Sequence, residues 1–536
     1  MTAAKPLDAA TVRDHILSGD EVAILDLREL GVFGDGHMLF AVNMPLSHLE
    51  TRIDDFVPRK DTPVILCSEG KSDRHLVDLG AERLIAWGYT DVSYLDGGLD
   101  AWDQAGFEVF SGVNVPSKAF GEFVEHTYDT PRVPPEEVKA MMDRGENMVV
   151  LDSRPMSEYH KMNIPMGIDC PGAELAYRVH DLAPDPETTV VVNCAGRTRS
   201  IIGAQSLINA GIPNKVVALE NGTMGWHLAG FQLEYGNDRK FPDRLSEEAR
   251  AKAREVAARV AKRFDVKSCT HDQLAAWKAE TGRTTYVLDV RNPDEFQAGH
   301  LQGSRHAPGG QLVQAWDRYV AVLGARIILV DDDCVRATMT ASWLVQMGWS
   351  EVFVLKSALD GQSLVKGRHV PRIHGLEAAS ADTVTPDGLE RMVADNVCVV
   401  VDLADSLTYR DGHIPGAWFA VRARLKDSIK KIPDARFTVL TSPDGVLAQL
   451  AASELRALGR RVAVLVDGTK GWKAAGKELQ SGFTHMADET NDVWYRPYDM
   501  DDAQEGAMKQ YLSWEINLVN QLERDGTTRF IKFPEA

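Results

Sequence analysis

Short, nearly continuous apolar runs alternate with amphipathic stretches along most of this chain. The alternation recurs four times, with a period of about 110 to 135 residues. In each copy a first apolar run ends in an acid and a second ends just before a polar loop. A helical stretch then closes at a glycine, and a third apolar run follows. The first runs are 23–28, 149–154, 287–291 and 399–403, the second are 64–67, 190–194, 327–331 and 439–442, and the closing glycines are Gly88, Gly211, Gly348 and Gly459.

Apolar strands that alternate with helices are typical of a parallel sheet covered on both faces. We therefore predict an α/β protein of four tandem domains, each a small parallel sheet flanked by helices, followed by a helical C-terminal arm. The predicted domains are 1–115, 128–237, 266–370 and 380–482, hereafter copies one to four. A linker helix is predicted in 238–265, with Ser246 as its N-cap, and the arm in 483–536.

The spacing between the second strand and the closing glycine differs in one copy. The glycine lies 17 positions after the strand end in copies two to four, and 21 positions after it in copy one. We interpret the four extra residues of copy one as about one helical turn.

Composition narrows the classes of function. With 59 Lys and Arg against 78 Asp and Glu, the net charge of −19 disfavours nucleic acid and anionic lipid as partners. No apolar run reaches the length of a membrane span and the N-terminus does not resemble a secretory signal, so we expect a cytoplasmic protein. The six cysteines form no CxxC pair. We therefore expect no metal or cofactor, and any cysteine chemistry should use a single thiol.

The loop after the second strand of copy two carries the strongest chemical signal. Cys194 lies at the strand end, and a short glycine-containing loop leads from it into a helix, where backbone N–H groups and the helix dipole lower a thiol pKa. Arg197 and Arg199 would favour the thiolate further and bind an anionic substrate. We predict Cys194 as the nucleophile, and as substrate-binding residues Ala195, Gly196, Arg197, Thr198, Arg199 and Ser200.

This pattern resembles the rhodanese family of sulfurtransferases, and the four copies resemble multidomain bacterial rhodaneses. The resemblance covers about residues 1–482. It depends on the Asp-x-Arg strand ends, the turn of 412–416, the Cys194-to-Arg199 loop and the ending with Trp226, all recurring in the same order. It implies thiosulfate sulfurtransferase activity. Cys194 would attack the outer sulfur of thiosulfate or a similar anionic donor, and its persulfide would pass sulfur to cyanide or a thiol acceptor.

The other copies depart from the motif. Copy one has Cys67 at the strand end, but Glu69 in its loop opposes a thiolate, so Cys67 is only the alternative nucleophile. The 17-residue spacing places Asp331 in copy three and Ser442 in copy four at the position of Cys194. We predict that these two copies are inactive. The recurring Asp-x-Arg pairs are interpreted as structural.

Two alternatives remain open at this point. One is a largely non-enzymatic sulfur carrier or scaffold. The other is a cysteine-dependent phosphatase or arsenate reductase of related fold, although by resemblance such phosphatases have five residues between cysteine and arginine, and here four separate Cys194 from Arg199. The C-terminal arm could pack on the body of the chain or on a second subunit of a homodimer.

Overall fold

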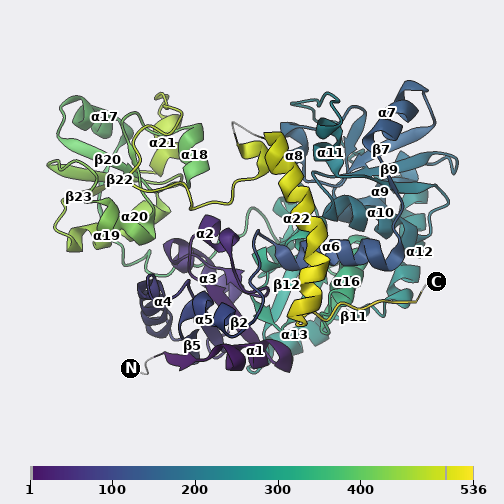
Figure 1. Ribbon diagram of the computed structural model, residues 1–536, viewed down its shortest axis with the longest axis horizontal. Coiled ribbons are helices and arrows are strands. Elements are labelled where there is room, and N and C mark those ends of the chain that lie inside the picture. The colour runs from purple at the N-terminus through teal and green to yellow at the C-terminus, as the bar shows by residue number, and fades with distance from the viewer. Residues whose placement is uncertain (1–3, 501–503, 535–536) are drawn as a thin grey trace. The chain divides into compact units, whose positions relative to one another are not determined.

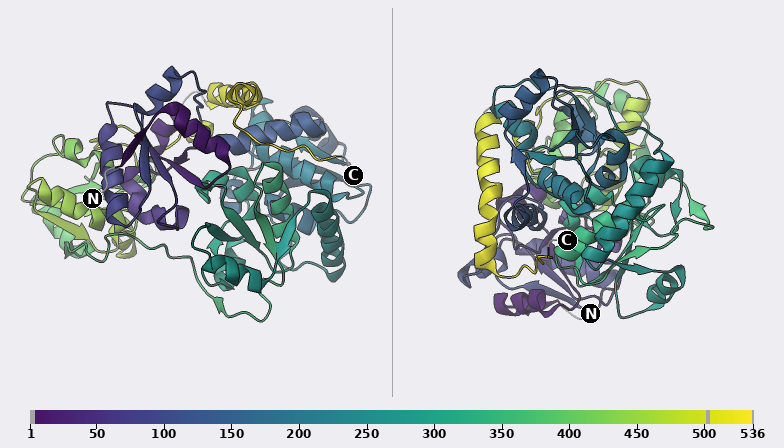
Figure 2. Two further views of the ribbon diagram at one scale, coloured as in Figure 1. Left: turned by 90° about the horizontal axis from the view of Figure 1, so that it is seen from below. Right: turned by 90° about the vertical axis from the view of Figure 1, so that its right-hand side faces the viewer.

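A computed structural model describes residues 4–500 and 504–534 of the chain, which divides into two units. One unit contains residues 1–12, 23–113 and 371–495, and therefore most of copy one together with copy four. The other contains residues 13–22, 114–370 and 496–536, and therefore copies two and three with the C-terminal helix. Figures 1 and 2 show the ribbon of each unit.

The unit of copies one and four holds two parallel sheets of the same strand order. In copy one the order is β1-β5-β4-β2, with β3 paired to β2, and in copy four it is β19-β23-β22-β20-β21. The elements of copy one are β1 (Lys5–Leu7), α1 (Ala9–Ser18), β2 (Val22–Asp26), α2 (Leu30–Asp35), β3 (Val42–Asn43), η1 (Leu46–His48), α3 (Leu49–Phe56), β4 (Val64–Cys67), α4 (Arg74–Ala86), β5 (Val92–Leu95) and α5 (Gly98–Gln104). Those of copy four are β19 (Asp382–Val384), α17 (Pro386–Ala394), β20 (Cys398–Asp402), α18 (Ser406–Asp411), β21 (Trp418–Phe419), η3 (Arg422–Arg424), α19 (Leu425–Ser428), β22 (Phe437–Thr441), α20 (Val446–Ala457), β23 (Val462–Leu465) and α21 (Gly468–Ala474).

The second unit repeats the same sheet twice, as β6-β10-β9-β7-β8 in copy two and β11-β17-β16-β12-β14 in copy three. Copy two consists of β6 (Arg132–Val133), α7 (Pro135–Asp143), β7 (Met148–Asp152), α8 (Met156–Lys161), β8 (Gly167–Asp169), α9 (Gly172–Leu182), β9 (Thr189–Asn193), α10 (Thr198–Ala210), β10 (Val216–Leu219) and α11 (Gly222–Leu228). Copy three consists of β11 (Lys267–Cys269), α13 (His271–Ala279), β12 (Thr285–Asp289), α14 (Pro293–Ala298), β13 (His300–Leu301), β14 (Arg305–His306), α15 (Gly309–Gln314), η2 (Trp316–Arg318), β15 (Val322–Leu323), β16 (Arg326–Val330), α16 (Val335–Gln346), β17 (Val352–Leu355) and β18 (Leu364–Val365).

Among the described residues of the second unit, four elements lie outside the repeats: α6 (Val115–Tyr128), α12 (Glu247–Arg263), η4 (Pro497–Asp499) and α22 (Gln504–Asp525). The predicted linker helix is α12, and the Ser246 side chain accepts a hydrogen bond from the Ala249 amide, which confirms its N-cap role. The C-terminal helix α22 packs against α6 and crosses it (Figure 1), and the right-hand view of Figure 2 shows α22 side-on. Among the described helices none is long and apolar enough to cross a bilayer.

The predicted α/β class and the four parallel sheets flanked by helices are confirmed. Central strands such as β2 and β16 are buried along their whole length, because helices cover both sheet faces. All four closing glycines have positive φ, between 67° and 98°, which is the left-handed conformation expected at a helix end.

The prediction of an additional helical turn in copy one is wrong. Helix α4 has 13 residues, the same number as α10. Most of the insertion lies in the loop instead, because six residues (68–73) separate Cys67 from α4, whereas three (195–197) separate Cys194 from α10.

Candidate functional site

The Cys194 loop connects the buried strand β9 to the N-terminus of α10. Its Cys194 and Ala195 carbonyls accept hydrogen bonds from the Thr223 and Met224 amides at the start of α11, at 2.8 and 3.0 Å. Gly222 permits this contact, because a Cβ there would lie 2.3 Å from the Cys194 carbonyl oxygen. Within residues 195–197, which are all described, no amide N–H donates a hydrogen bond within the protein. These N–H groups can therefore bind an anion.

The Cys194 thiol is buried at the base of this loop. It is 2% exposed, and its Sγ donates a hydrogen bond to Ser200 Oγ at 3.4 Å. Burial raises the pKa of this thiol above its ordinary value, although Arg199 and hydrogen bonds from Ser200 act in the opposite direction. The expectation that the loop lowers the thiol pKa is therefore wrong, since desolvation outweighs the nearby positive charge.

Arg197 binds a neighbouring helix. Its guanidinium forms a bidentate pair with Glu122 of α6, both contacts at 2.7 Å, and a further ion pair with Glu125. Arg197 is 4% exposed, so its charge is already compensated inside the protein. In this structure Arg197 attaches the loop to α6.

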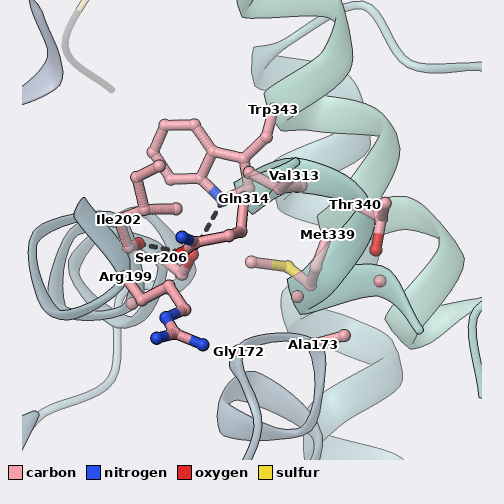
Figure 3. Close-up of a pocket in the computed structure, with 13 residues that line it drawn as sticks. Gly172, Ala173, Arg199, Ile202, Ser206, Val313, Gln314, Met339, Thr340 and Trp343 are labelled. Atoms are coloured by element: carbon pink, nitrogen blue, oxygen red, sulfur yellow. Dashed lines mark hydrogen bonds between the residues drawn. The ribbon is translucent and has the colours of Figure 1, made fainter. Parts of the chain in front are cut away.

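Arg199 is also paired. Its Nη1 and Nη2 bond the Glu158 carboxylate of α8 at 3.0 and 2.7 Å, and Nη1 reaches Gln311 of copy three at 3.3 Å. Figure 3 shows the Arg199 guanidinium beside Gly172 in a small hollow that both copies line. Unlike Arg197, Arg199 still acts electrostatically on Cys194. Of the predicted site residues, Ser200 is thus hydrogen-bonded to the thiol and Arg199 acts on it through its charge.

The C-terminal helix α22 covers the loop and supplies residues that sequence reasoning missed. Glu515 Oε1 accepts hydrogen bonds from Thr198 Oγ1 at 2.9 Å and from the Tyr511 hydroxyl at 3.3 Å. A Cβ on Gly196 would lie 3.3 Å from Glu515 Oε2, a buried oxygen that has no hydrogen-bond partner. A buried carboxylate therefore lies directly against the predicted anion-binding loop.

A buried lysine lies beside Glu515. Lys118 of α6 places its Nζ 4.6 Å from the ring centroids of both Tyr511 and Trp514. Burial lowers the pKa of Lys118 to about 8, while Glu515 acts to raise it. No sequence motif indicates Lys118 or Glu515, because they lie far along the chain from Cys194.

Cys67 of copy one has a different environment. Its thiol donates to the Leu25 carbonyl at 3.5 Å, and burial raises its pKa well above the ordinary value. The Asp73 carboxylate accepts hydrogen bonds from the amide N–H groups of Glu69 and Gly70, both at 3.0 Å. A carboxylate of the inserted loop therefore occupies two of the loop's own N–H donors.

Copies three and four also satisfy their loops internally. The Asp331 carboxylate accepts hydrogen bonds from the Asp333 amide at 2.9 Å and from the Ala337 amide at 3.0 Å. Its carboxylate thus occupies the loop that would otherwise bind an anion. In copy four, the loop amide of Gly445 donates a hydrogen bond to the Ser442 carbonyl at 3.3 Å, and Asp444 Oδ1 accepts one from the Val446 amide at 3.0 Å. Ser442 Oγ accepts a hydrogen bond from the Ala448 amide of α20 at 3.4 Å.

The Asp-x-Arg pairs have the structural role that we expected. Arg154 binds Asp152 through Nε and Nη2 and also donates to the Met162 carbonyl, and the pair is almost fully buried. In copies one and three the corresponding arginine likewise donates hydrogen bonds to its aspartate and to a turn carbonyl. Copy four has Ala404 in place of the arginine.

Comparison with known proteins identifies relatives of this chain. The family model described as "Rhodanese-like domain" matches residues 8–105, 134–229, 270–361 and 385–475. The crystal structure of a thiosulfate sulfurtransferase from Pseudomonas aeruginosa is 47% identical, with a TM-score of 0.94, and the match covers 99% of this chain and 100% of that one. The putative sulfur carrier protein YrkF of Bacillus subtilis is 26% identical over 165 residues, which is 29% of this chain and 86% of that protein.

Proposed function

Because this chain belongs to the rhodanese-like family, we propose that it is a sulfurtransferase that uses Cys194 as its nucleophile and thiosulfate as a donor. The observation that carries this proposal is the Cys194 loop. Of the four corresponding loops, it alone combines a cysteine with N–H groups that no carboxylate of its own loop occupies. The similarity to the Pseudomonas sulfurtransferase over 99% of the chain supports the same reaction class.

The proposed reaction has two steps. The Cys194 thiolate attacks the outer sulfur of thiosulfate, the sulfur–sulfur bond breaks, and sulfite leaves with the bonding electron pair. The acceptor, cyanide or a thiolate, then attacks the outer sulfur of the persulfide and releases the Cys194 thiolate. The N–H groups of residues 195–197 and the α10 N-terminus would stabilise the negative charge on the persulfide.

The paired arginines change how the donor would be bound. Arg197 and Arg199 each form an ion pair with a glutamate. Donor binding would therefore depend on the loop N–H groups and on the positive electrostatic potential that Arg199 still exerts near Cys194. The substrate-binding role of residues 195–200 is part of this proposal.

Intact-mass measurement after thiosulfate treatment tests the proposal. We expect the mass of one added sulfur atom per chain, located on Cys194 by peptide mapping and removed by cyanide. A chain that carries no sulfur after treatment, or that carries it on Cys67, would contradict the proposal. A carrier would also take up one sulfur, so steady turnover of thiosulfate and cyanide distinguishes the enzyme from the carrier.

A further inference from the structure

The unit of copies one and four contains a cavity of about 220 Å³ that no part of the proposed reaction uses. Both copies and the segment after copy four line it. Its polar lining includes Glu29, His48, Arg52, Asp405, Arg422 and Asp492. Apolar walls are supplied by Leu30, Leu403, Val421, Leu447 and Val493.

The repeat register relates this cavity to the catalytic copy. Ala404 lies two residues after the strand-end Asp402, as Arg154 follows Asp152, and Leu447 lies five residues after Ser442, as Arg199 follows Cys194. Two arginines of copy two, Arg154 and Arg199, are therefore replaced by Ala404 and Leu447, and both replacements line the cavity. The cavity therefore lacks both arginines of copy two, and the cations in its lining are Arg52 and Arg422.

Copies two and three have almost no space at the position that corresponds to this cavity. There, a Cβ on Gly310 would lie 2.8 Å from the Gly172 nitrogen, and the remaining hollow is only about 30 Å³ (Figure 3). Gly309, three residues after β14, corresponds to Arg422, three residues after β21. Glycines allow the backbones of copies two and three to come into contact. In copies one and four, the Arg422 side chain takes the place of Gly309.

Two residues that line the cavity, Asp492 and Arg422, each have one buried polar atom without a hydrogen-bond partner within the protein. Asp492 is 9% exposed, and its Oδ2 accepts the Ser406 amide at 2.7 Å while its buried Oδ1 has no partner. Arg422 is held through its two Nη atoms by Glu50 and Glu454, yet its buried Nε has no partner. Such atoms carry a desolvation cost that a ligand with matching groups removes.

Glu29 adds a second carboxylate to the same cavity. It is 7% exposed, and its Oε1 accepts a hydrogen bond from Ser47 Oγ at 2.5 Å. Burial raises the pKa of Glu29 to about 7; Ser47 and Arg424 act against this rise, and Asp492 and Asp488 add to it. Burial likewise raises the pKa of Asp492. The two carboxylates thus lack a full complement of positive charge.

We infer that this cavity binds a small zwitterionic amino acid with an apolar side chain. Its ammonium group would bind Glu29 and Asp492, its carboxylate would accept the Arg422 Nε–H, and its side chain would contact Leu447 and Val493. Charge-assisted hydrogen bonds supply the affinity, and the volume admits a molecule of this size. The inference does not depend on the proposed sulfur transfer, because Cys194 lies in the other unit.

Calorimetric titration of the full chain at about pH 8, where Glu29 is largely ionised, tests the inference. The probes are L-leucine, isoamylamine (which has only the ammonium group) and 4-methylpentanoate (which has only the carboxylate). We expect L-leucine to bind most tightly, isoamylamine at least about tenfold more weakly, and 4-methylpentanoate not measurably. No heat with L-leucine at millimolar concentration, or equal affinity for 4-methylpentanoate, would overturn the inference.

Three variants locate the binding site. Asp492→Asn and Glu29→Gln keep the shape but remove the charge, and each should weaken L-leucine binding about tenfold or more. Ala404→Leu should reduce binding by filling the cavity. Glu489→Gln, at an exposed acid three residues before Asp492, is the matched control and should bind normally. Circular dichroism confirms that each variant is folded, and unchanged affinity in folded Asp492→Asn and Glu29→Gln would refute the site.

Discussion

The loops of Cys194 and Cys67 begin alike, with a cysteine at the end of a buried central strand, but differ in what binds their amide groups. In copy two the N–H groups of residues 195–197 have no acceptor within the protein, and the thiol lies beside Ser200. In copy one the Asp73 carboxylate takes two loop N–H groups, and the thiol faces the Leu25 carbonyl. We therefore expect that a strand-end cysteine is insufficient for sulfur transfer, and that the loop must also leave its anion-binding N–H groups free.

The comparison predicts its largest effect at the two cysteines themselves. Cys194→Ser should lower thiosulfate:cyanide sulfur transfer at least about 10³-fold, because serine is a poor sulfur nucleophile. Cys67→Ser, the matched control, should change the rate less than about twofold. Steady-state rates of the two variants check this prediction. Substantial transfer by Cys194→Ser would move the nucleophile to Cys67.

A second prediction concerns the protonation of Cys194. Burial raises its thiol pKa above the ordinary value, so at neutral pH most of the thiol is protonated and only the minor thiolate attacks. The value of kcat/KM for thiosulfate should therefore rise with pH, by about tenfold per unit below the thiol pKa. A pH profile of single-turnover sulfur loading measures this rise. A rate that is flat from about pH 6 to 8 would mean that the thiolate is already formed.

Glu515 should have a smaller effect of predictable sign. Its carboxylate opposes ionisation of Cys194, so Glu515→Gln should shift the pH profile toward lower pH and lower KM for thiosulfate by about threefold. Glu523→Gln, at an exposed acid of the same helix, is the control and should leave both quantities unchanged. A higher KM in Glu515→Gln would indicate that the carboxylate aids donor binding.

The smallest effect is expected in the loop of copy one. Asp73→Ala removes the acceptor of the Glu69 and Gly70 amides, so these amides should exchange with solvent about tenfold faster. Sulfur loading at Cys67 should remain well below that at Cys194, because the Cys67 thiol still faces the Leu25 carbonyl. Hydrogen exchange and peptide mapping measure the two outcomes. Full loading at Cys67 would show that Asp73 alone blocks that site.

Local patterns in the sequence determined much of the fold. Apolar strand runs, positive-φ glycines and the Ser246 cap follow from backbone geometry over a few residues, and they predicted the four sheets, the helix ends and the linker helix. The same local reasoning placed Cys194 at the N-terminus of α10, because a strand end and a helix start are visible in the pattern.

Tertiary structure alone decided the charges around that cysteine. Glu158, Glu122 and Glu515, which lie 41, 75 and 317 residues from their bonding partners, pair with Arg199, Arg197 and Thr198. Burial by these elements reversed the expected direction of the Cys194 pKa shift. The four inserted residues of copy one likewise entered a loop rather than a helix. A pattern of neighbouring residues determines backbone geometry, whereas a pKa depends on every charge and surface that folding brings within a few ångströms.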